Sequence, residues 1–286
     1  MSDLLLRQRA HARPAEAPAE PAVLVPPRAA HAVRRAGRLA VAVGLRSVAV
    51  VAFLLLWEVA PRIGLVDPVF LPPLSEVLAT TRDLAASGQL GEHVRASLVR
   101  AGSGFGIAVV AAIPLGLLIG WYRTVSTVLS PILEAFRNTA ALALLPVFVL
   151  VLGIGETSKI ALVAFASFFP ILLNTISGVR TVDPLLVRSA RSLGLSPLRL
   201  FQKVILPSAV PTIFTGLRMA GAASVLVLVA AEMIGAQAGL GYLINAAQLN
   251  FQIPEMYAGI LTISVIGIVV NYVLLAAERR FSRWRA

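Results

Sequence analysis

Six apolar stretches run along the chain, each bounded by charged residues, glycines or prolines. A bilayer core is about 30 Å thick and a helix rises about 1.5 Å per residue, so roughly 20 apolar residues span it. The stretches cover Ser47–Ile63, Leu98–Tyr122, Pro131–Leu152, Lys159–Ser177, Ala209–Ile234 and Met256–Ala277. They exceed the strands of about 9–11 residues that build membrane barrels, and a helix satisfies its own backbone hydrogen bonds in lipid. The pattern therefore predicts an all-α polytopic membrane protein with six transmembrane helices.

Composition strengthens this prediction. Of the 286 residues, 58% are hydrophobic and only 14% are charged, which excludes an ordinary water-soluble enzyme. The chain has no cysteine, and its three histidines, His11, His31 and His93, are scattered. Disulfides and cysteine nucleophiles are therefore excluded, and no metal site is expected.

Basic residues gather in three places. Residues 1–46 are rich in alanine, proline and arginine and hold eight arginines, which predicts a disordered cytoplasmic tail that is not a cleaved signal peptide. The loop 178–206 holds five basic residues and the C-terminal segment 278–286 holds four. Lysine and arginine favour the cytoplasmic side, so both termini and this loop are expected there, around a six-helix domain of residues 47–277. Topology thus explains the net charge of +11, and no nucleic-acid binding is expected.

The outer segment Asp67–Glu92 carries a helical pattern of its own. After the breaker run Phe70–Pro73, leucines and a valine recur at helical spacing among charged residues. This predicts an amphipathic helix at the membrane interface that covers the outer rim of the bundle, with docking of an external partner as the alternative.

The loop 178–206 predicts two short helices joined by a glycine. Asp183 before Pro184 is a good helix start, because aspartate caps the first turn and proline needs no amide there. Gly194 suits a C-terminal cap with positive φ, and Pro197 opens the second helix. The result is a bent knob. It either enters a groove on another protein or is an ordinary solvated loop whose basic residues touch anionic headgroups.

This loop resembles the signature of the membrane permease subunits of ATP-binding-cassette importers, which reads E-A-A, three residues, glycine, nine residues, isoleucine, any residue and Leu-Pro. Here Ala190, Gly194 and the pair Leu206-Pro207 keep that spacing, while arginine, serine and valine replace the glutamate, the first alanine and the isoleucine. Further similarities lie at Phe70–Pro73, Ser97–Arg100, Gly153–Gly155, Gly216–Arg218, Ala231–Met233 and Gly239–Gly241. The wider pattern is similar to permeases for aliphatic sulfonates, taurine and nitrate.

The resemblance implies a type I importer permease in the inner (plasma) membrane, which gives a small organic or inorganic anion an alternating-access path. The implied partners are a second copy of the permease, two ATPase subunits, an extracytoplasmic solute-binding protein and membrane lipid. The ATPases would use ATP and magnesium and grip the loop as a coupling helix. This chain lacks a phosphate loop, so we expect it to bind no cofactor and to be no enzyme. The implied coupling residues are Arg188, Ser189, Ala190, Arg191, Ser192, Leu193, Gly194, Leu195, Ser196, Pro197, Leu206 and Pro207.

Ionisable residues within spans are candidates for a translocation pathway or gate, because a charge at the bilayer centre costs about 2.5–3.5 kcal/mol. Arg100 either extends outward to the interface or contacts an anion. Arg218 lies well inside the fifth span and suits a polar pathway or an interhelix contact. Glu232 ends that span, as a helix-end residue or as a gate hinge with Gly235.

Other residues within the spans bear on how the helices pack. Glu134 and Arg137 are three apart on a helix and are expected to pair. The pairs Gly102–Gly106 and Gly116–Gly120 have the spacing of close helix contacts. Three prolines within the spans, Pro114, Pro146 and Pro170, are expected to bend their helices and either open a cavity or only shape the bundle. Asn174 is a polar candidate for lining a path.

The alternative function is that of an ion-coupled secondary transporter. Such a protein would show ionisable residues at mid-membrane and inverted repeats that relate its halves. The sequence shows no persuasive inverted repeat, and only Arg218 is deeply placed. An integral membrane enzyme is disfavoured because paired carboxylates and a histidine cluster are lacking.

Overall fold

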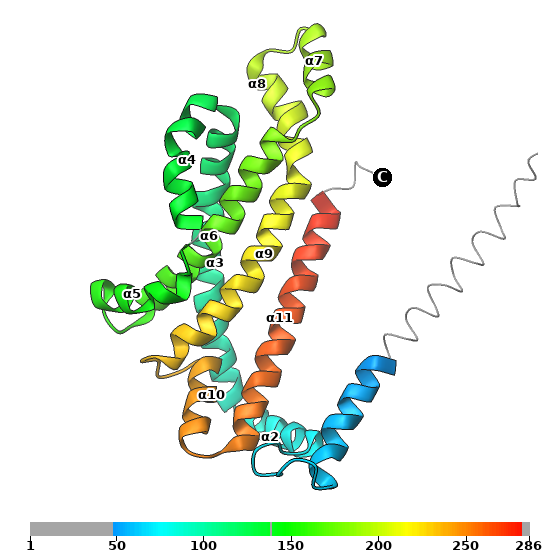
Figure 1. Ribbon diagram of the computed structural model, residues 1–286, viewed down its shortest axis with the longest axis vertical. Helices are drawn as coiled ribbons and strands as arrows, with labels where there is room; N and C mark the ends of the chain where they lie inside the picture. Colours follow the sequence, from blue (N-terminus) through cyan, green and yellow to red (C-terminus); the bar gives the residue numbers. More distant parts are fainter. Residues whose placement is uncertain (1–47, 138, 282–286) are drawn as a thin grey trace, which may run out of the picture. The chain divides into compact units, whose positions relative to one another are not determined.

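The computed structural model describes residues 48–137 and 139–281, and every regular element in these residues is a helix (Figure 1). The chain divides into two units, residues 1–56 and 57–286. Of the first unit, only the helical residues 48–56 are described. The predicted tail 1–46 and the last residues of the basic C-terminus therefore lie outside the described residues. The prediction of an all-α protein is confirmed.

The core of the second unit is built by three long helices, α3 (Gln89–Trp121), α6 (Glu156–Arg180) and α9 (Leu206–Met233). Helix α6 packs against both α3 and α9 along most of its length. Buried apolar side chains such as Ile119, Ile171, Leu172 and Ile213 fill the space between them. Helix α11 (Ile253–Phe281) packs on α9 and on α10 (Leu240–Leu249).

Glycines on α3 allow α6 to approach closely. A Cβ atom added at Gly116 would lie 2.7 Å from Thr175 Cβ, and one at Gly120 would lie 2.7 Å from Val179 Cβ. The predicted pair Gly116–Gly120 is thus a close helix contact. The pair Gly102–Gly106 is not, because added Cβ atoms there would meet nothing within 4 Å; Gly104, between them, makes the contact instead. Glycine spacing recurs on several faces of one helix, so spacing alone does not identify the packed face.

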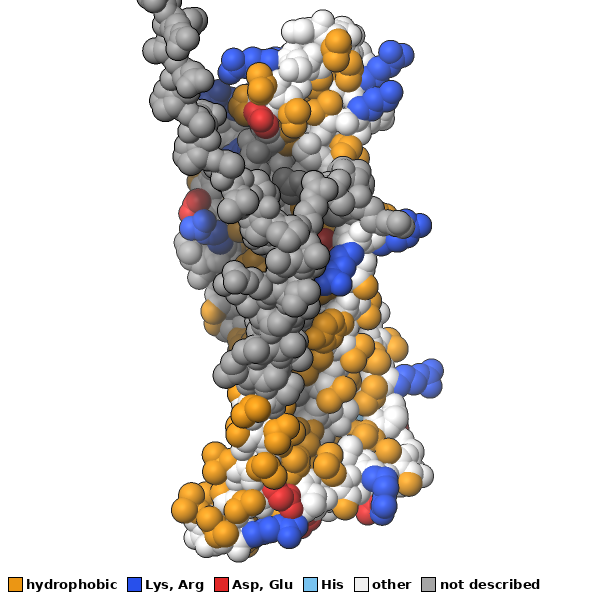
Figure 2. Space-filling model, turned by 90° about the vertical axis from the view of Figure 1, so that its right-hand side faces the viewer, with side chains coloured by type: hydrophobic (Ala, Val, Ile, Leu, Met, Phe, Trp, Pro, Cys, Tyr) orange, Lys and Arg blue, Asp and Glu red, His pale blue; other side chains and the backbone are white. Residues whose placement is uncertain are grey.

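Four helices in the described residues are long and apolar enough to cross a membrane: Gln89–Trp121, Glu156–Arg180, Pro197–Met233 and Ile253–Phe281. Large apolar side chains on α11, including Val265, Ile268 and Val273, are exposed as lipid-facing residues are. Figure 2 shows hydrophobic side chains over much of the visible part of one face, with Lys and Arg side chains near both ends. The first predicted span, Ser47–Ile63, is described only as helical residues 48–62.

The third predicted span, Pro131–Leu152, is wrong as a single helix. Helix α4 (Arg123–Arg137) precedes the 3-10 turn η1 (Ala141–Leu144) and α5 (Leu145–Leu152), and the two halves meet at 84°. Residues 123–130, which precede the predicted span, are also helical. Pro146 begins α5, where its missing amide costs nothing, instead of bending a helix interior. Pro114 and Pro170 do lie inside their helices. A continuous apolar run does not reveal such a break, so with the bent pair the described spans number five at most.

The predicted amphipathic helix is confirmed as α2 (Leu74–Ala86). Its Val77 and Leu84 are buried against Leu240 and Ala258, so α2 covers α10 and α11 at the end of the bundle opposite α7 and α8 (Figure 1). The predicted ion pair on α4 is also present, with Glu134 Oε2 3.6 Å from Arg137 Nη2.

The glycine contacts yield a matched pair of substitutions. We expect Gly116→Ala to lower the free energy of unfolding by about 1–3 kcal/mol, because the new methyl overpacks against Thr175. Gly102→Ala meets open space, and we expect it to be neutral or to stabilise the helix by up to about 1 kcal/mol. Thermal unfolding of the purified protein in detergent measures both changes, and equal effects would contradict the packing of α3 on α6.

Candidate functional site

The predicted knob is present between α6 and α9. It consists of residues 183–200 and contains α7 (Pro184–Ser192) and α8 (Pro197–Leu200). The Asp183 carboxylate accepts a hydrogen bond of 2.8 Å from the Leu185 amide, so the predicted cap is confirmed. Pro184 occupies the first turn, where no amide partner is required.

The corner of the knob explains the spacing of the signature. Gly194 has a φ of +75°, its amide donates to Arg191 O at 2.9 Å, and the Leu195 amide donates to Ala190 O at 3.2 Å. These two bonds form a Schellman cap, which needs a left-handed residue after the helix. Ala190 is buried at the start of this cap, four residues before the glycine. A small residue and a glycine four apart are therefore what this corner requires.

The knob is joined to the bundle by an unbroken helix. After α8, a π-helical turn, η2 (Phe201–Ile205), leads directly into α9, whose first turn contains Leu206 and Pro207. The Phe201 ring packs edge-on against Trp121 of α3, with ring centroids 5.2 Å apart. The Leu-Pro pair of the signature thus begins the helix that runs from the knob to Met233.

The outer surface of the knob is both apolar and basic. Leu193 and Leu198 are 79% and 66% exposed, and with the exposed Leu185 and Leu186 they give this short segment four exposed leucines, a clustering typical of a contact surface. Arg188, which stands where the family has glutamate, is exposed and has no ion pair among the described residues, and the same holds for Arg191. Such a surface suits contact with a groove on another protein.

At the opposite end of the bundle, Arg100 of α3 lies at the centre of an ionic network that is buried at Arg100 and Glu232 and 62% exposed at Glu156. Its Nη1 lies 2.7 Å from Glu232 Oε1 of α9, and its Nε and Nη2 donate to the Glu156 carboxylate of α6 at 2.5 and 2.7 Å. Nη1 also donates to Ala238 O at 2.6 Å. Arg100 is only 4% exposed, so the expectation that it extends outward to the interface is wrong.

Glu232 is fully buried and uses both carboxylate oxygens. The Ser97 hydroxyl donates to this carboxylate, and the Gly241 amide donates to Oε2 at 2.9 Å. Ser97 Oγ in turn accepts from the Leu240 amide. A Cβ atom at Gly239, whose φ is +125°, would collide with the carboxylate, so glycine lets the chain cross over it. We call Ser97, Arg100, Glu156 and Glu232 the Arg100 network.

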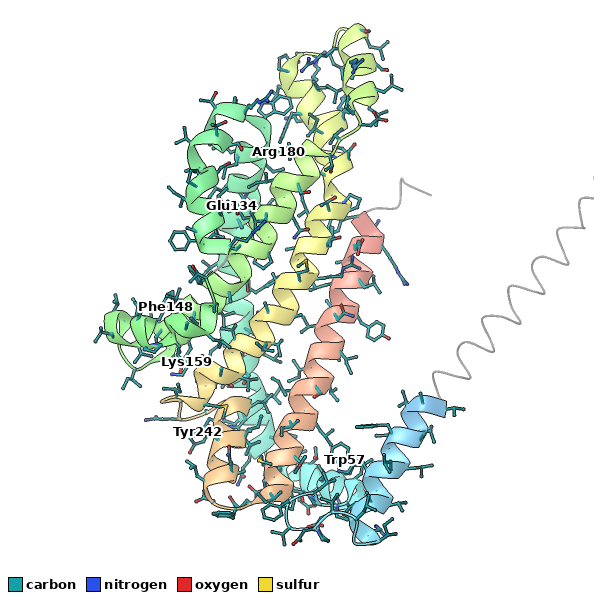
Figure 3. The ribbon with its side chains drawn as sticks, in the orientation of Figure 1. Trp57, Glu134, Phe148, Lys159, Arg180 and Tyr242 are labelled. Atoms are coloured by element: carbon teal, nitrogen blue, oxygen red, sulfur yellow. The ribbon has the colours of Figure 1, made fainter. Side chains whose placement is uncertain are left out.

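Lys159, labelled in Figure 3, balances the charge of this region. It is buried, and its Nζ donates to the carbonyls of Gly155 at 3.0 Å and Gly235 at 3.3 Å. Arg100 and Lys159 together carry two positive charges against the two negative charges of Glu156 and Glu232. Buried charges are tolerated only with such pairing and hydrogen bonding. The arrangement therefore ties α3, α6 and α9 and the segment before α10 into one rigid end.

The structure brings together two of the five predicted pathway residues, Arg100 and Glu232. Sequence reasoning missed their partners Ser97, Glu156 and Lys159. A signal was present, because Ser97 and Arg100, like Glu156 and Lys159, are three residues apart and so share a helix face. Nothing local, however, indicates that these two faces meet.

The other predicted pathway residues lie elsewhere, and their roles stay predictions. Arg218 Nη1 is 2.9 Å from Glu278 Oε2, near the C-terminal end of α11. Asn174 donates to Pro170 O at 2.8 Å inside α6. A hollow of about 150 Å³ between α3, α9 and α11 is lined by none of these residues.

Residues 112–285 match the family model described as "Binding-protein-dependent transport system inner membrane component". The chain belongs to this family. A probable ABC transporter permease protein of Brucella abortus is 39% identical over 76% of this chain and 87% of its own length. The taurine transport system permease protein TauC of Escherichia coli is 37% identical over 83% and 89%. The putative aliphatic sulfonates transport permease protein SsuC of Bacillus subtilis is 35% identical over 80% and 83%.

Solved structures show the same fold. The chain of the MetNI methionine ABC transporter in an inward-facing conformation has a TM-score of 0.55 and 19% identity, and the match covers 66% of this chain and 94% of that one. An amino acid ABC transporter with histidines gives a TM-score of 0.51 and 20% identity, over 72% and 96%. The protein is thus a permease subunit of an ABC importer, a transport component and not an enzyme. The ion-coupled alternative is not supported.

The Arg100 network predicts a large difference between buried and exposed carboxylates. We expect Glu232→Ala to lower the free energy of unfolding by about 3–5 kcal/mol, because Arg100 would remain buried with its charge partly uncompensated. Asp83→Asn, in the exposed pair Arg82–Asp83, is the control and should change it by less than about 1 kcal/mol. Unfolding in detergent measures both, and a similarly small change in the two variants would refute the network's structural role.

Proposed function

We propose that this permease moves a small organic sulfonate through an alternating-access path, driven by two partner ATPases that grip the knob. The knob carries this proposal, because its capped corner presents exposed leucines, and arginines that form no ion pair with the residues the structure describes, at one end of a long helix. The partner ATPases use ATP and magnesium, and an extracytoplasmic solute-binding protein delivers the solute. The coupling residues are those of the knob from Arg188 to Pro197, with Leu206 and Pro207 at the root of α9.

The basic residues support a cytoplasmic knob. The loop that forms it holds five basic residues, whereas segments 153–158 and 235–255 at the other end hold none. Both termini are then cytoplasmic, in the inner membrane. The Arg100 network lies at the extracytoplasmic end, where Glu232 and Arg100 act in a gate.

A second copy of the permease completes the path. The space between α3, α6 and α9 is filled with apolar side chains, which leaves no polar route through the core of one copy in the described residues. Exposed apolar side chains on α5, among them Leu150 and Val151, favour burial against a second copy or lipid. A path between two copies then lets relative tilting of the bundles open either side.

The solute class rests on the relatives. The taurine and aliphatic sulfonate permeases, at 35–37% identity, favour a sulfonate. The formylaminopyrimidine transport permease protein ThiX of Halalkalibacterium halodurans, at 31% identity, is named for a different class of solute. Inorganic anions such as nitrate are the other members of the predicted class.

Docking of the knob is tested with Leu193→Glu. A charge placed in an apolar docking groove costs at least about 1.4 kcal/mol, so we expect co-purification of the ATPase subunits to fall about tenfold or more. Leu249→Glu, which alters a similarly exposed leucine at the opposite end, should leave co-purification unchanged. Gly194→Glu should likewise uncouple ATP hydrolysis from uptake without lowering membrane insertion, because the corner needs positive φ. Normal coupling in both knob variants would contradict the proposal.

The solute is tested in liposomes that contain the permease, its ATPases and its binding protein. We expect ATP-dependent uptake of labelled taurine, and competition by an excess of an alkanesulfonate that reduces it about tenfold or more, because both share the sulfonate group that a polar site recognises. Nitrate and a formylaminopyrimidine are the comparison solutes. If an excess of nitrate or of the formylaminopyrimidine alone reduced the uptake of taurine, the solute class would be that of the competitor. The absence of any taurine uptake would also assign another solute.

A further inference from the structure

The end of the bundle that carries the knob also contains a basic hollow. It has a volume of about 520 Å³ and lies between the C-terminal ends of α3 and α6 and the first turns of α4. Two guanidinium groups line it, those of Arg123 and Arg180, together with the hydroxyls of Ser126, Thr127 and Ser130. No carboxylate is among its lining residues. Figure 3 shows Arg180 at the end of α6, next to α4 and at the opposite end of α6 from Lys159.

Neither arginine of the hollow is neutralised by an acidic side chain in the described residues. Arg180 donates to the Ser126 hydroxyl, and Arg123 forms no ion pair there. Arg100, Arg137 and Arg218, by contrast, each face a carboxylate. The hydroxyls of Thr127 and Ser130 donate to the carbonyls of Arg123 and Ser126 in α4. Two uncompensated guanidinium groups, with the Ser126 hydroxyl beside them, match an anion with several oxygen acceptors, such as a phosphate group.

An apolar groove adjoins this hollow. It also measures about 520 Å³ and is lined by α3 residues from Pro114 to Trp121, by Tyr122, by Leu198 of the knob and by Phe201 of η2. Trp121 lines both spaces. A ligand that fills both must join an anionic head to an apolar tail, and tryptophan and tyrosine are typical of the level where lipid headgroups meet acyl chains.

We propose that the hollow and the groove together bind one anionic phospholipid. Its phosphate lies between Arg123 and Arg180, and an acyl chain follows the groove past Leu118 and Trp121. The site requires that the knob end of α3 lies at the membrane surface, as in the proposed function, but it is independent of the solute. Because Trp121 also contacts Phe201, the bound lipid touches the helix that joins the knob to α9.

The test is lipid binding to the full-length permease, measured by native mass spectrometry during titration with phosphatidylglycerol or phosphatidylcholine. Each basic residue near an anionic lipid contributes about fivefold in affinity, so Arg123→Gln should weaken phosphatidylglycerol binding about fivefold and the double variant Arg123→Gln/Arg180→Gln about 25-fold. Phosphatidylcholine binding should not change. Arg137→Gln removes the same charge from the same helix but outside the hollow, and should bind phosphatidylglycerol as the native protein does.

A second arm separates lipid from free anion. Millimolar inorganic phosphate should not displace phosphatidylglycerol, and Leu118→Gln should weaken lipid binding because it places an amide in the groove. Arg123 is exposed and unpaired, so Arg123→Gln should fold normally even if the double variant does not. Unchanged phosphatidylglycerol binding in Arg123→Gln, or its displacement by inorganic phosphate, would overturn the proposal. The ATPase and uptake assays above do not depend on either result.

Discussion

The ion pair between Arg100 and Glu232 is the interaction on which the arrangement of the helices most depends. Neither charge tolerates burial alone, because the cost of removing an ion from water is several kcal/mol and only a close partner offsets it. Glu232 therefore fixes the end of α9 beside α3, and Glu156 on the same arginine fixes the start of α6. The glycines of α3 then allow α6 to pack along it, with Thr175 and Val179 against the bare backbone. Charge fixes the end of the bundle, and small residues set its spacing.

The two ends of the bundle differ in how far their charged and apolar side chains are satisfied by contacts within the protein. At the Arg100 network, hydrogen bonds satisfy both carboxylates and the arginine, and together with the nearby Lys159 two positive charges balance two negative charges. At the knob, leucines are exposed and arginines lack acidic partners among the described residues. One continuous helix, Pro197–Met233, connects the two. A force applied to the knob therefore reaches Glu232 through about 55 Å of continuous helix, in which the π-helical turn η2 and Pro211 inside α9 are the places where bending is expected.

Features held by contacts between residues close in the sequence were predicted, and features held by contacts between distant residues were missed. The knob was predictable because its signals are local: Asp183 caps a helix two residues away, and at the corner Gly194 and Leu195 donate to carbonyls three and five residues back. The apolar runs likewise predicted the long helices. The Arg100 network was missed because Arg100 and Glu232 are 132 residues apart, and no periodicity encodes that distance. The bend before α5 was missed because an apolar run looks the same whether the helix is straight or broken.

These constraints bear on how a permease without its own energy source changes conformation. Opening the end that holds the Arg100 network would expose or separate several charges at once, so the closed end is favoured while α3, α6 and α9 keep these contacts. A ligand shifts such an equilibrium only by its differential affinity for the two states. In the proposed function, the solute-binding protein would reach this end from outside, whereas the ATPases would act at the far end of α9. Under that proposal, work done on the knob has to arrive at Glu232, so the continuity of α9 would be as necessary to the transport cycle as the chemistry at either end.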